Sequence, residues 1–558
     1  MTSSKKKHLF PFRLVLFLCS FLLAILLGAC SISLPDLLKT GPKFVRATYF
    51  YQNYHDESGC NTLIDSNGVI LSQKKDLIDV ANSIDNSKIV TLSAAGPGGS
   101  GGTLELAGES GSSVIAENVY DFKLSTNGNA ILYLSDFDGK SGVLYHCDLK
   151  SMEKTKLTEN AFGYNAKNDQ WDHTYFVSLL SISPDGKTVG YLEGKSDSFP
   201  SGAIRTIGKE PRILNKGLFP LFLTNGGKTV YCLKTEDRNA TASSLCALSG
   251  DGLATLCEAV EPTATTLIQA SADHEELFLT AGDNMIYCRG GEIVKKYPNN
   301  NYFIIAPNVL TNYVSYGLRL FDYNFTVYDR DLNGGMAGLF FTAASNNERV
   351  VCYLNENAEM EEIRSPEPFY SLSLSLDGKK LLLWGESQTL YLVDAASKEL
   401  SPTRLAQNVK SFCSDADFEN VYYLDLDGQL WKINCKDKKP ESLAANLDAL
   451  FIVFQDKTKT IFASADPDGD RVYSVYSIKE SENNVDLIKM NHSDYPLMLS
   501  VTADSVSYLA NADLEKQTGD LYFIVGEEPP VKIKRFPYKN SAPPRPSARG
   551  AASHFIPL

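Results

Sequence analysis

A chain of 558 residues with 43% hydrophobic and 22% charged residues can bury a large core and is too apolar for an intrinsically disordered protein. Its net charge of −14 is unevenly placed, because residues 1–29 carry four positive charges and no acid, and residues 531–558 carry six and no acid. Removing these ten charges leaves −24 on the residues between them, and so acidic a surface repels nucleic acid, which excludes that class of partner.

The first predicted element is an export signal. Lys5, Lys6, Lys7 and Arg13 precede an apolar run over 14–27, and small residues follow it, as in secretory signals. An uncleaved transmembrane helix over 14–34 is the alternative, since about 20 apolar residues span a bilayer. Either alternative exports the rest of the chain.

The end of the apolar run, Leu27-Gly28-Ala29-Cys30, resembles the lipobox of bacterial lipoproteins. The resemblance implies that residues 1–29 are a signal peptide, that Cys30 is lipidated, and that the protein is lipid-anchored on the extracytoplasmic face of the cell membrane. Residues 30–44 are then a tether. Residues 45–73 are expected to supply a strand that closes the domain that follows.

Past residue 80 one pattern keeps returning: an alternating apolar stretch, a short polar turn, and a second apolar stretch. Alternation at a period of two predicts half-buried strands, and Asp-Gly or Asn-Gly supplies the positive φ of a tight hairpin. The turn positions, which are spaced about 40–47 residues apart, are 186, 227 and 274, and then 378, 418, 457 and 504. Units of this length with several strands each predict an all-β chain of propeller blades.

Three copies of the repeat carry a family resemblance. Ser183-Pro184-Asp185-Gly186-Lys187 with its flanking strands resembles the repeats of TolB-like and WD-type β-propellers; Ser135-Asp136-Phe137-Asp138-Gly139 matches their second turn, and Ser375-Leu376-Asp377-Gly378-Lys379 matches with Leu in the Pro position. Similar repeats form the propeller of prolyl oligopeptidase-type peptidases. The resemblance implies a binding platform more than a chemical reaction.

We therefore expect one β-propeller over residues 45–528, with about eight four-stranded blades and a range of seven to ten. Residues 529–558 contain seven prolines and no sustained apolar pattern, which predicts a disordered, Pro-rich basic tail.

Nine cysteines remain after Cys30, an odd number that cannot all pair within one chain. Most lie in strand-like apolar runs, where a free cysteine is a small buried hydrophobe. Cys232 and Cys246 are the pair placed to face each other across a hairpin, and a disulfide between them is the alternative that export would allow. The sequence contains no CxxC spacing of a zinc or redox site.

One loop has the composition of a calcium site. Asp329, Asp331 and Asn333 fit the front half of D-x-[DN]-x-[DN]-G, but Phe340 stands where an EF-hand needs glutamate. We predict a calcium site of another kind there, with a polar hairpin turn as the alternative. Asp466, Asp468 and Asp470 form a second acidic cluster, which we assign to a blade turn.

No residue is predicted to be catalytic, and no cofactor is predicted besides calcium. Residues 98–102 satisfy G-x-S-x-G, but no helix pattern follows, so a Gly-rich hairpin loop is predicted instead of a nucleophile elbow. Residues 226–229 (GGKT) are assigned to a hairpin turn because Phe222 stands where a phosphate loop needs glycine. The histidines are scattered and are expected to be structural.

The sequence thus predicts a membrane-anchored propeller that binds an envelope protein or a glycan. The competing class is a propeller enzyme, a lyase or hydrolase with carboxylates in the central funnel. A third is an assembly factor whose basic tail docks on an acidic partner.

Overall fold

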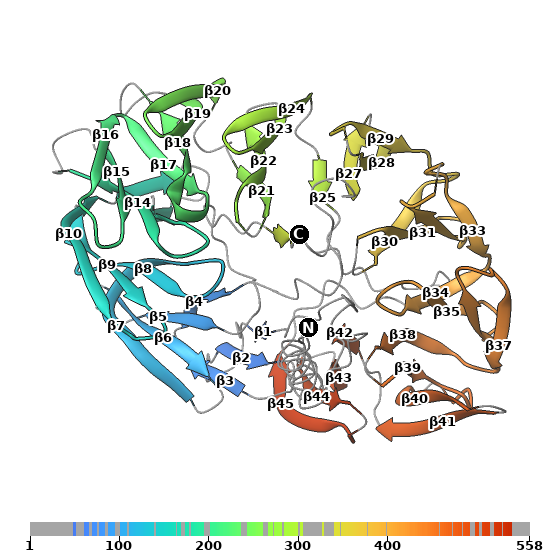
Figure 1. Ribbon diagram of the computed structural model, residues 1–558. Helices are drawn as coiled ribbons and strands as arrows, with labels where there is room; N and C mark the ends of the chain where they lie inside the picture. The colour runs from blue at the N-terminus through green and yellow to red at the C-terminus, as the bar shows by residue number, and fades with distance from the viewer. Residues whose placement is uncertain are drawn as a thin grey trace, which may run out of the picture. The chain divides into compact units, whose positions relative to one another are not determined.

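The structure of the chain is a computed structural model, shown as a ribbon in Figure 1. The residues that it describes are 48–51, 61–65, 70–74, 77–83, 88–94, 101–108, 111–138, 141–162, 164–168, 173–177, 180–194, 201–235, 243–260, 266–271, 273–281, 284–298, 302–304, 326–328, 340–345, 348–355, 357–375, 378–397, 399–456, 458–470, 472–481, 484–491, 497–501, 505–513, 518–526 and 528–537. The chain divides into two compact parts, Met1–Lys43 and Phe44–Leu558, and every described residue belongs to the second part.

Within the described residues the secondary structure is β-strand, apart from one 3-10 turn, η1 (Asn225–Gly227). No helix in this part of the chain is both long and apolar enough to cross a membrane. The predicted all-β class is confirmed.

The first three strands form a sheet of their own. Its order is β1 (Thr48–Tyr51), β2 (Asn61–Asp65) and β3 (Ile70–Lys74), all antiparallel. The segment expected to supply a closing strand forms, in the described part of the chain, a sheet whose three strands pair with one another. Short hairpin connections explain this, because each strand finds its partner a few residues away.

Next comes a sheet of eleven strands that contains three four-stranded units. Unit 1 is β4–β7, unit 2 is β7–β10 and unit 3 is β13–β16. The strands are β4 (Leu77–Asn82), β5 (Ile89–Ala94), β6 (Gly102–Gly108), β7 (Gly111–Leu124), β8 (Ala130–Ser135), β9 (Ser141–Asp148), β10 (Lys154–Phe162), β13 (Ser181–Ile182), β14 (Thr188–Glu193), β15 (Ser201–Thr206) and β16 (Arg212–Lys216).

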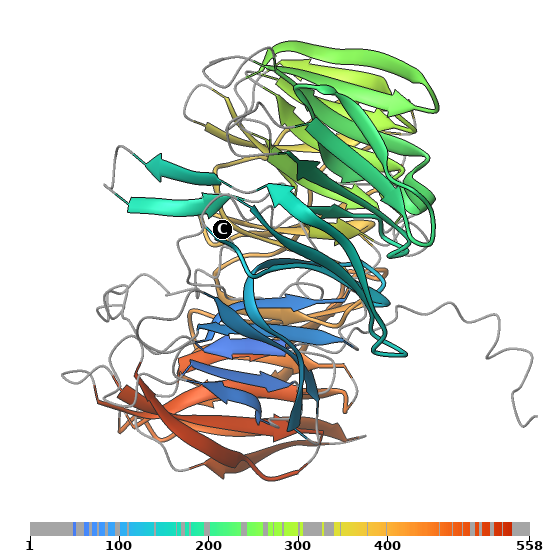
Figure 2. The same cartoon turned by 90° about the vertical axis from the view of Figure 1, so that its left-hand side faces the viewer.

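Strand β7 belongs to two units because it is long. Its first part, up to Val119, pairs with β6, and its last part, from Val119, pairs with β8. Asn118, directly before the residue that the two partners share, has a φ of 55°. A separate hairpin, β11 (Tyr164–Asn168) with β12 (His173–Val177), is inserted between units 2 and 3, and Figure 2 shows its two teal strands standing apart from the four-stranded sheets.

Seven further sheets follow in chain order, as the colours of Figure 1 show. Units 4 to 6 consist of β17 (Leu218–Leu223), β18 (Thr229–Lys234), β19 (Ser243–Ser249), β20 (Gly252–Val260); β21 (Thr266–Ser271), β22 (Glu276–Ala281), β23 (Asn284–Arg289), β24 (Glu292–Pro298); and β25 (Tyr302–Ile304), β27 (Phe340–Ser345), β28 (Glu348–Leu354), β29 (Met360–Ile363). One extra strand, β26 (Thr326–Tyr328), pairs in parallel with β21.

Units 7 to 10 are four-stranded and antiparallel throughout. Their strands are β30 (Phe369–Leu374), β31 (Lys380–Gly385), β32 (Leu390–Asp394), β33 (Thr403–Ala406); β34 (Val409–Ser414), β35 (Asn420–Asp425), β36 (Leu430–Asn434), β37 (Pro440–Ala444); β38 (Ala449–Gln455), β39 (Thr460–Ala465), β40 (Ser474–Ser481), β41 (Asn484–Asn491); and β42 (Leu497–Val501), β43 (Ser505–Asp513), β44 (Thr518–Val525), β45 (Val531–Pro537).

The hydrophobic core lies between consecutive sheets. Each neighbouring pair from units 1 and 2 to units 9 and 10 shares one cluster of buried side chains. First strands also lie beside first strands, as β34 does with β38 and β38 with β42. A four-stranded sheet with two apolar faces needs a neighbouring sheet on each side to remove both faces from water. The blades of a propeller are stabilised in this way.

The predicted β-propeller class is thereby confirmed. Ten four-stranded units follow one another within the described residues, more than the eight expected and at the upper limit of the predicted range. The number of blades that share one ring stays a prediction.

The turn between the first two strands of a unit explains why the repeat has its sequence. In unit 3, the Ser183 hydroxyl donates to Asp185 at 2.6 Å and accepts the N–H of Thr188 at 2.9 Å. Gly186 closes the turn with a φ of +75°, a conformation that costs glycine little. The hydroxyls of Ser125 in unit 2 and Ser271 in unit 5 form the same two kinds of hydrogen bond: each donates to a side-chain oxygen two residues on and accepts a backbone N–H five residues on.

These turns also connect different units. The N–H of Asn127 in unit 2 donates to the carbonyl of Pro184 in unit 3 at 3.2 Å, and the N–H of Asn225 in unit 4 donates to the carbonyl of Asp273 in unit 5 at 3.1 Å. Thr126 Oγ1 lies 3.3 Å from Nε2 of His274. The turns of units 2 to 5 are therefore hydrogen-bonded to one another as well as folded locally.

Candidate functional site

Two predicted sites fall on parts of the chain that the structure does not describe. Cys30 belongs to the part Met1–Lys43, and Asp329, Asp331 and Asn333 come after β26 in the sequence. Lipidation of Cys30 and calcium binding at 329–333 therefore stay predictions.

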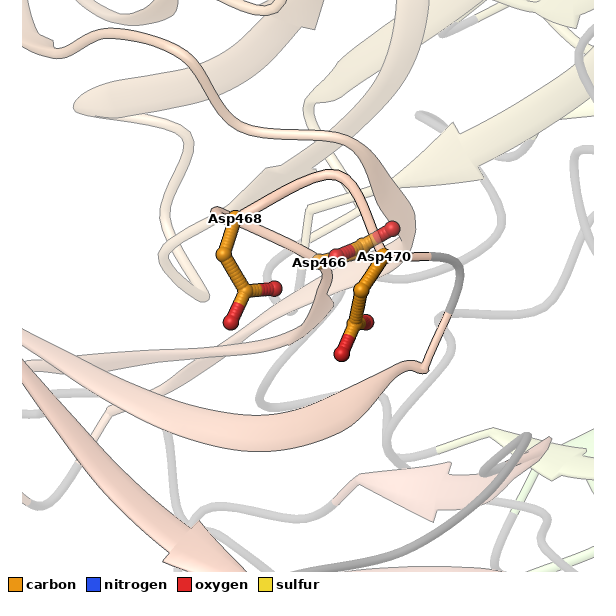
Figure 3. Close-up of side chains that lie close together, drawn as sticks. All are labelled: Asp466, Asp468 and Asp470. Atoms are coloured by element: carbon orange, nitrogen blue, oxygen red, sulfur yellow. The ribbon is translucent and has the colours of Figure 1, made fainter.

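The described residues bring together a different acidic group. One carboxylate oxygen from each of Asp466, Asp468 and Asp470 lies within 4.8 Å of the others, and Figure 3 shows the three side chains around the same loop. Asp466 is buried, with 3% exposure, whereas Asp468 and Asp470 are exposed. From sequence this D-x-D-x-D segment was assigned to a turn between strands, and the structure confirms that it joins β39 to β40.

Local hydrogen bonds shape this loop. The N–H of Gly469, whose φ is +73°, donates to a carboxylate oxygen of Asp466 at 2.9 Å. The N–H of Val472 donates to Asp470 at 2.7 Å. These bonds fix the shape of the loop and so hold the three carboxylates close together. Carboxylate oxygens are ligands that hard cations such as calcium take.

A second network lies beside the loop. The N–H of Asp466 donates to the backbone carbonyl of Asp448 at 3.0 Å, which joins the two. The carboxylate of Asp448 accepts the Tyr473 hydroxyl at 2.9 Å and forms an ion pair with Lys410 of β34 in unit 8. Burial opposes ionisation of Asp448, but the hydrogen bonds from Lys410 and Tyr473 prevail and lower its pKa.

Lys410 compensates the charge of Asp448, and the loop that joins this segment brings three further carboxylates together. Oxygen-rich sites of this kind suit calcium, which takes six to eight oxygen ligands at about 2.3–2.6 Å. Three carboxylates supply part of such a shell, and the remainder would come from water or from oxygens of a bound partner.

The two histidines whose side chains are described are structural, as expected. His146 Nε2 lies 2.9 Å from the carbonyl oxygen of Gly186, and His274 Nδ1 lies 3.0 Å from that of Leu223. Burial lowers the pKa of both imidazoles, to about 4 for His274. Each therefore stays neutral at pH 7 and contacts a backbone group.

The two glycine-rich motifs are hairpins. Strands β5 and β6 pair antiparallel on either side of residues 95–101, so a strand follows the G-x-S-x-G segment where a nucleophile elbow needs a helix. Residues 225–227 form η1 between β17 and β18, with φ of +65° and +66° at Gly226 and Gly227. Both predictions from the sequence are confirmed.

Sequence reasoning missed the Lys410–Asp448–Tyr473 network. Its members come from two units, and the repeat pattern gives no register between neighbouring sheets. In the sequence, Lys410 stands next to the buried Val409 in a half-buried strand, and nothing there distinguishes it from the lysines of other strands.

The chain was compared with protein families, curated proteins and solved structures. No family model matches the chain, and no curated protein matches it. Among solved structures it is similar to TolB from Acinetobacter baumannii, with 13% identity and a TM-score of 0.27, over 45% of this chain and 63% of that one, which is less than two thirds of TolB.

Two other solved structures are covered over nearly their full length. Oligogalacturonate lyase from Vibrio parahaemolyticus is 12% identical with a TM-score of 0.27, over 79% of this chain and 96% of that one. The β-propeller domain of the Trilobed protease from Pyrococcus furiosus is 9% identical with a TM-score of 0.29, over 75% and 99%. The fold is assigned from the ten four-stranded units and the hydrophobic clusters between them.

Proposed function

We propose that the protein is an exported β-propeller, anchored to the membrane through a lipid on Cys30, that binds an envelope protein or a glycan. The β39–β40 loop is the proposed contact, with calcium bridging Asp466, Asp468 and Asp470 to oxygens of the partner. Export follows from the signal-like residues 1–29, and calcium is abundant outside cells.

The observation that carries the proposal is the arrangement of the loop on a rigid support. Two exposed carboxylates and one buried carboxylate converge at the end of unit 9, and the sheets below them are packed on both faces. Such placement of polar groups on a loop held by a rigid scaffold is typical of binding sites. The strongly acidic middle of the chain also favours a cation over an anionic ligand.

The contact is tested by cross-linking in intact cells followed by mass spectrometry. We expect discrete adducts of the wild-type chain that fall several-fold in Asp468→Asn/Asp470→Asn, because the open side of the calcium shell is lost. Asp427→Asn/Asp437→Asn removes two exposed carboxylates elsewhere and is the matched control. Equal adduct yields in the two double variants would exclude the loop as the contact. A calcium chelator should also reduce the yield, and a chelator-insensitive yield would exclude the metal.

The anchor is tested separately. In cells fed a labelled fatty acid, we expect the wild-type protein to carry the label and Cys30→Ala to lack it. The apparent mass of the wild-type protein in the same experiment shows whether residues 1–29 are removed or retained. Wild-type protein that remains in the membrane unlabelled would contradict the lipid anchor and support an uncleaved helix.

A further inference from the structure

Cys232 and Cys246 stand directly opposite each other in the sheet of unit 4. They are paired residues in the register of β18 with β19, and both are fully buried. The Cα atoms of opposed residues in antiparallel strands lie about 4.5–5.5 Å apart. Disulfides bridge Cα separations of about 4.4–6.8 Å, so the backbone places the two residues within range.

The two side chains also point to the same face of the sheet. Opposed residues of paired strands share a face, as do residues two positions apart. Cys232 lies in the cluster that includes Leu214 and Val230, which fills the space between units 3 and 4. The contacts of the two sulfurs are long: Cys232 Sγ lies 3.7 Å from the Val230 carbonyl oxygen, and Cys246 Sγ lies 3.8 Å from the Ser244 carbonyl oxygen and 3.9 Å from Thr255 Oγ1.

We propose that Cys232 and Cys246, which are free thiols in this structure, form a cross-strand disulfide when the chain folds in the presence of a disulfide donor. The bond ties β18 to β19 across the connection over 235–242. This proposal goes beyond the binding function and does not depend on it.

The chemistry is two successive thiol–disulfide exchanges. The thiolate of one cysteine attacks the donor, forms a mixed disulfide and releases one donor thiol; the second cysteine attacks the mixed disulfide and releases the other. The two cysteines lose two electrons and two protons, and the donor gains both. Burial raises the pKa of Cys232 to about 12, so the thiolate is scarce in the folded state and the exchange belongs to folding.

Cys288 is the internal control. It is also fully buried, in the neighbouring unit 5, and burial raises its pKa to about 12 as well. Its opposed residues are Leu277 and Ile293, so the register offers it no cysteine. We therefore expect Cys288 to remain a thiol, although it is as deeply buried as Cys232 and Cys246.

The test is refolding of the purified full chain. The protein is reduced and unfolded, refolded with a mixture of oxidised and reduced glutathione, quenched in acid, unfolded again and labelled with N-ethylmaleimide. We expect the peptides of Cys232 and Cys246, which tryptic cleavage after Lys234 separates, to be recovered joined and unlabelled, while Cys288 is fully labelled. Protein exported to a bacterial periplasm provides a second sample if refolding is inefficient.

Labelling of Cys232 and Cys246 to the extent of Cys288, in either sample of folded protein, would overturn the proposal. Joining of either residue to a different cysteine would overturn it too. Since neither sample involves a ligand or cells that make the binding partner, failure here leaves the proposed function untouched.

Discussion

Gly186→Ala is expected to lower the free energy of unfolding by about 2–5 kcal/mol, well above the cost of the same change at Gly208. Both glycines have a left-handed φ, +75° and +81°, so alanine pays a similar backbone strain of about 1–2 kcal/mol at each. A Cβ at Gly186 would in addition lie 2.7 Å from Cβ of Ala130 in unit 2, whereas at Gly208 it would meet nothing within 4 Å. The difference between the two variants therefore measures contact between units.

Urea unfolding followed by tryptophan fluorescence provides the measurement, with the midpoint and the slope compared for wild type, Gly186→Ala and Gly208→Ala. Gly227→Ala is a second test of the same kind, because its Cβ would lie 2.6 Å from Cγ2 of Thr188 in unit 3. If Gly186→Ala and Gly208→Ala shift the midpoint equally, the units are not packed against each other as closely as the structure places them.

The turn at Gly186 also shows how far the sequence alone reaches. Asp185-Gly186 between two alternating apolar runs predicts a hairpin, because the chemistry that selects a tight turn is contained within a few residues. The contacts of that turn with Ala130 and His146 were not predicted, since they join positions that the repeat treats as independent.

Strand β7 shows a second limit. Its fourteen residues serve two units, and the change of partner occurs at Val119, directly after Asn118, whose φ is 55°. Sequence periodicity treats Asn118 as one more polar position in a strand, so this change of partner was not predicted. The alternation of apolar and polar residues predicts where strands and turns lie and which face of a strand is buried. Which strands pair with one another, and how the sheets pack, depends on tertiary structure.

The candidate site follows the same division. The acidic composition of residues 466–470 was visible in the sequence, and so was its place between strands. Which aspartate is buried was not, because Asp466 is covered only once β39 and the Asp448 segment come together. The spacing of the aspartates in the sequence predicts carboxylate ligands, whereas the packing of neighbouring units determines where each carboxylate lies.

Acidification should destabilise the wild-type protein more than His274→Asn. His274 is fully buried and neutral, with a pKa of about 4, mainly because burial disfavours the imidazolium, while the Leu223 carbonyl and the charge of Asp273 oppose this shift. Its pKa in the unfolded chain is the ordinary 6.5. Between these values the unfolded chain binds a proton that the folded chain does not.

The sign follows from that difference in bound protons. Stability contributed by neutral His274 is fully present above pH 6.5, is lost as the pH falls from 6.5 towards 4, and changes no further below 4. The loss over this window is about 3 kcal/mol, since one pKa unit corresponds to about 1.4 kcal/mol. His146 acts in the same direction in both proteins, so its effect cancels in the comparison.

Asparagine is the suitable replacement because it tolerates the φ of 56° at position 274 better than most residues. Thr126→Val is the control: it removes the hydroxyl 3.3 Å from Nε2 but leaves the histidine buried. Unfolding free energies measured by urea from pH 7 to pH 4 should show a shallower decline for His274→Asn and an unchanged one for Thr126→Val. Parallel declines for all three proteins would mean that His274 takes up its proton at the same pH in the folded and the unfolded chain. The ring, with its hydrogen bond to the Leu223 carbonyl, would then have to tolerate a buried charge below pH 6.5.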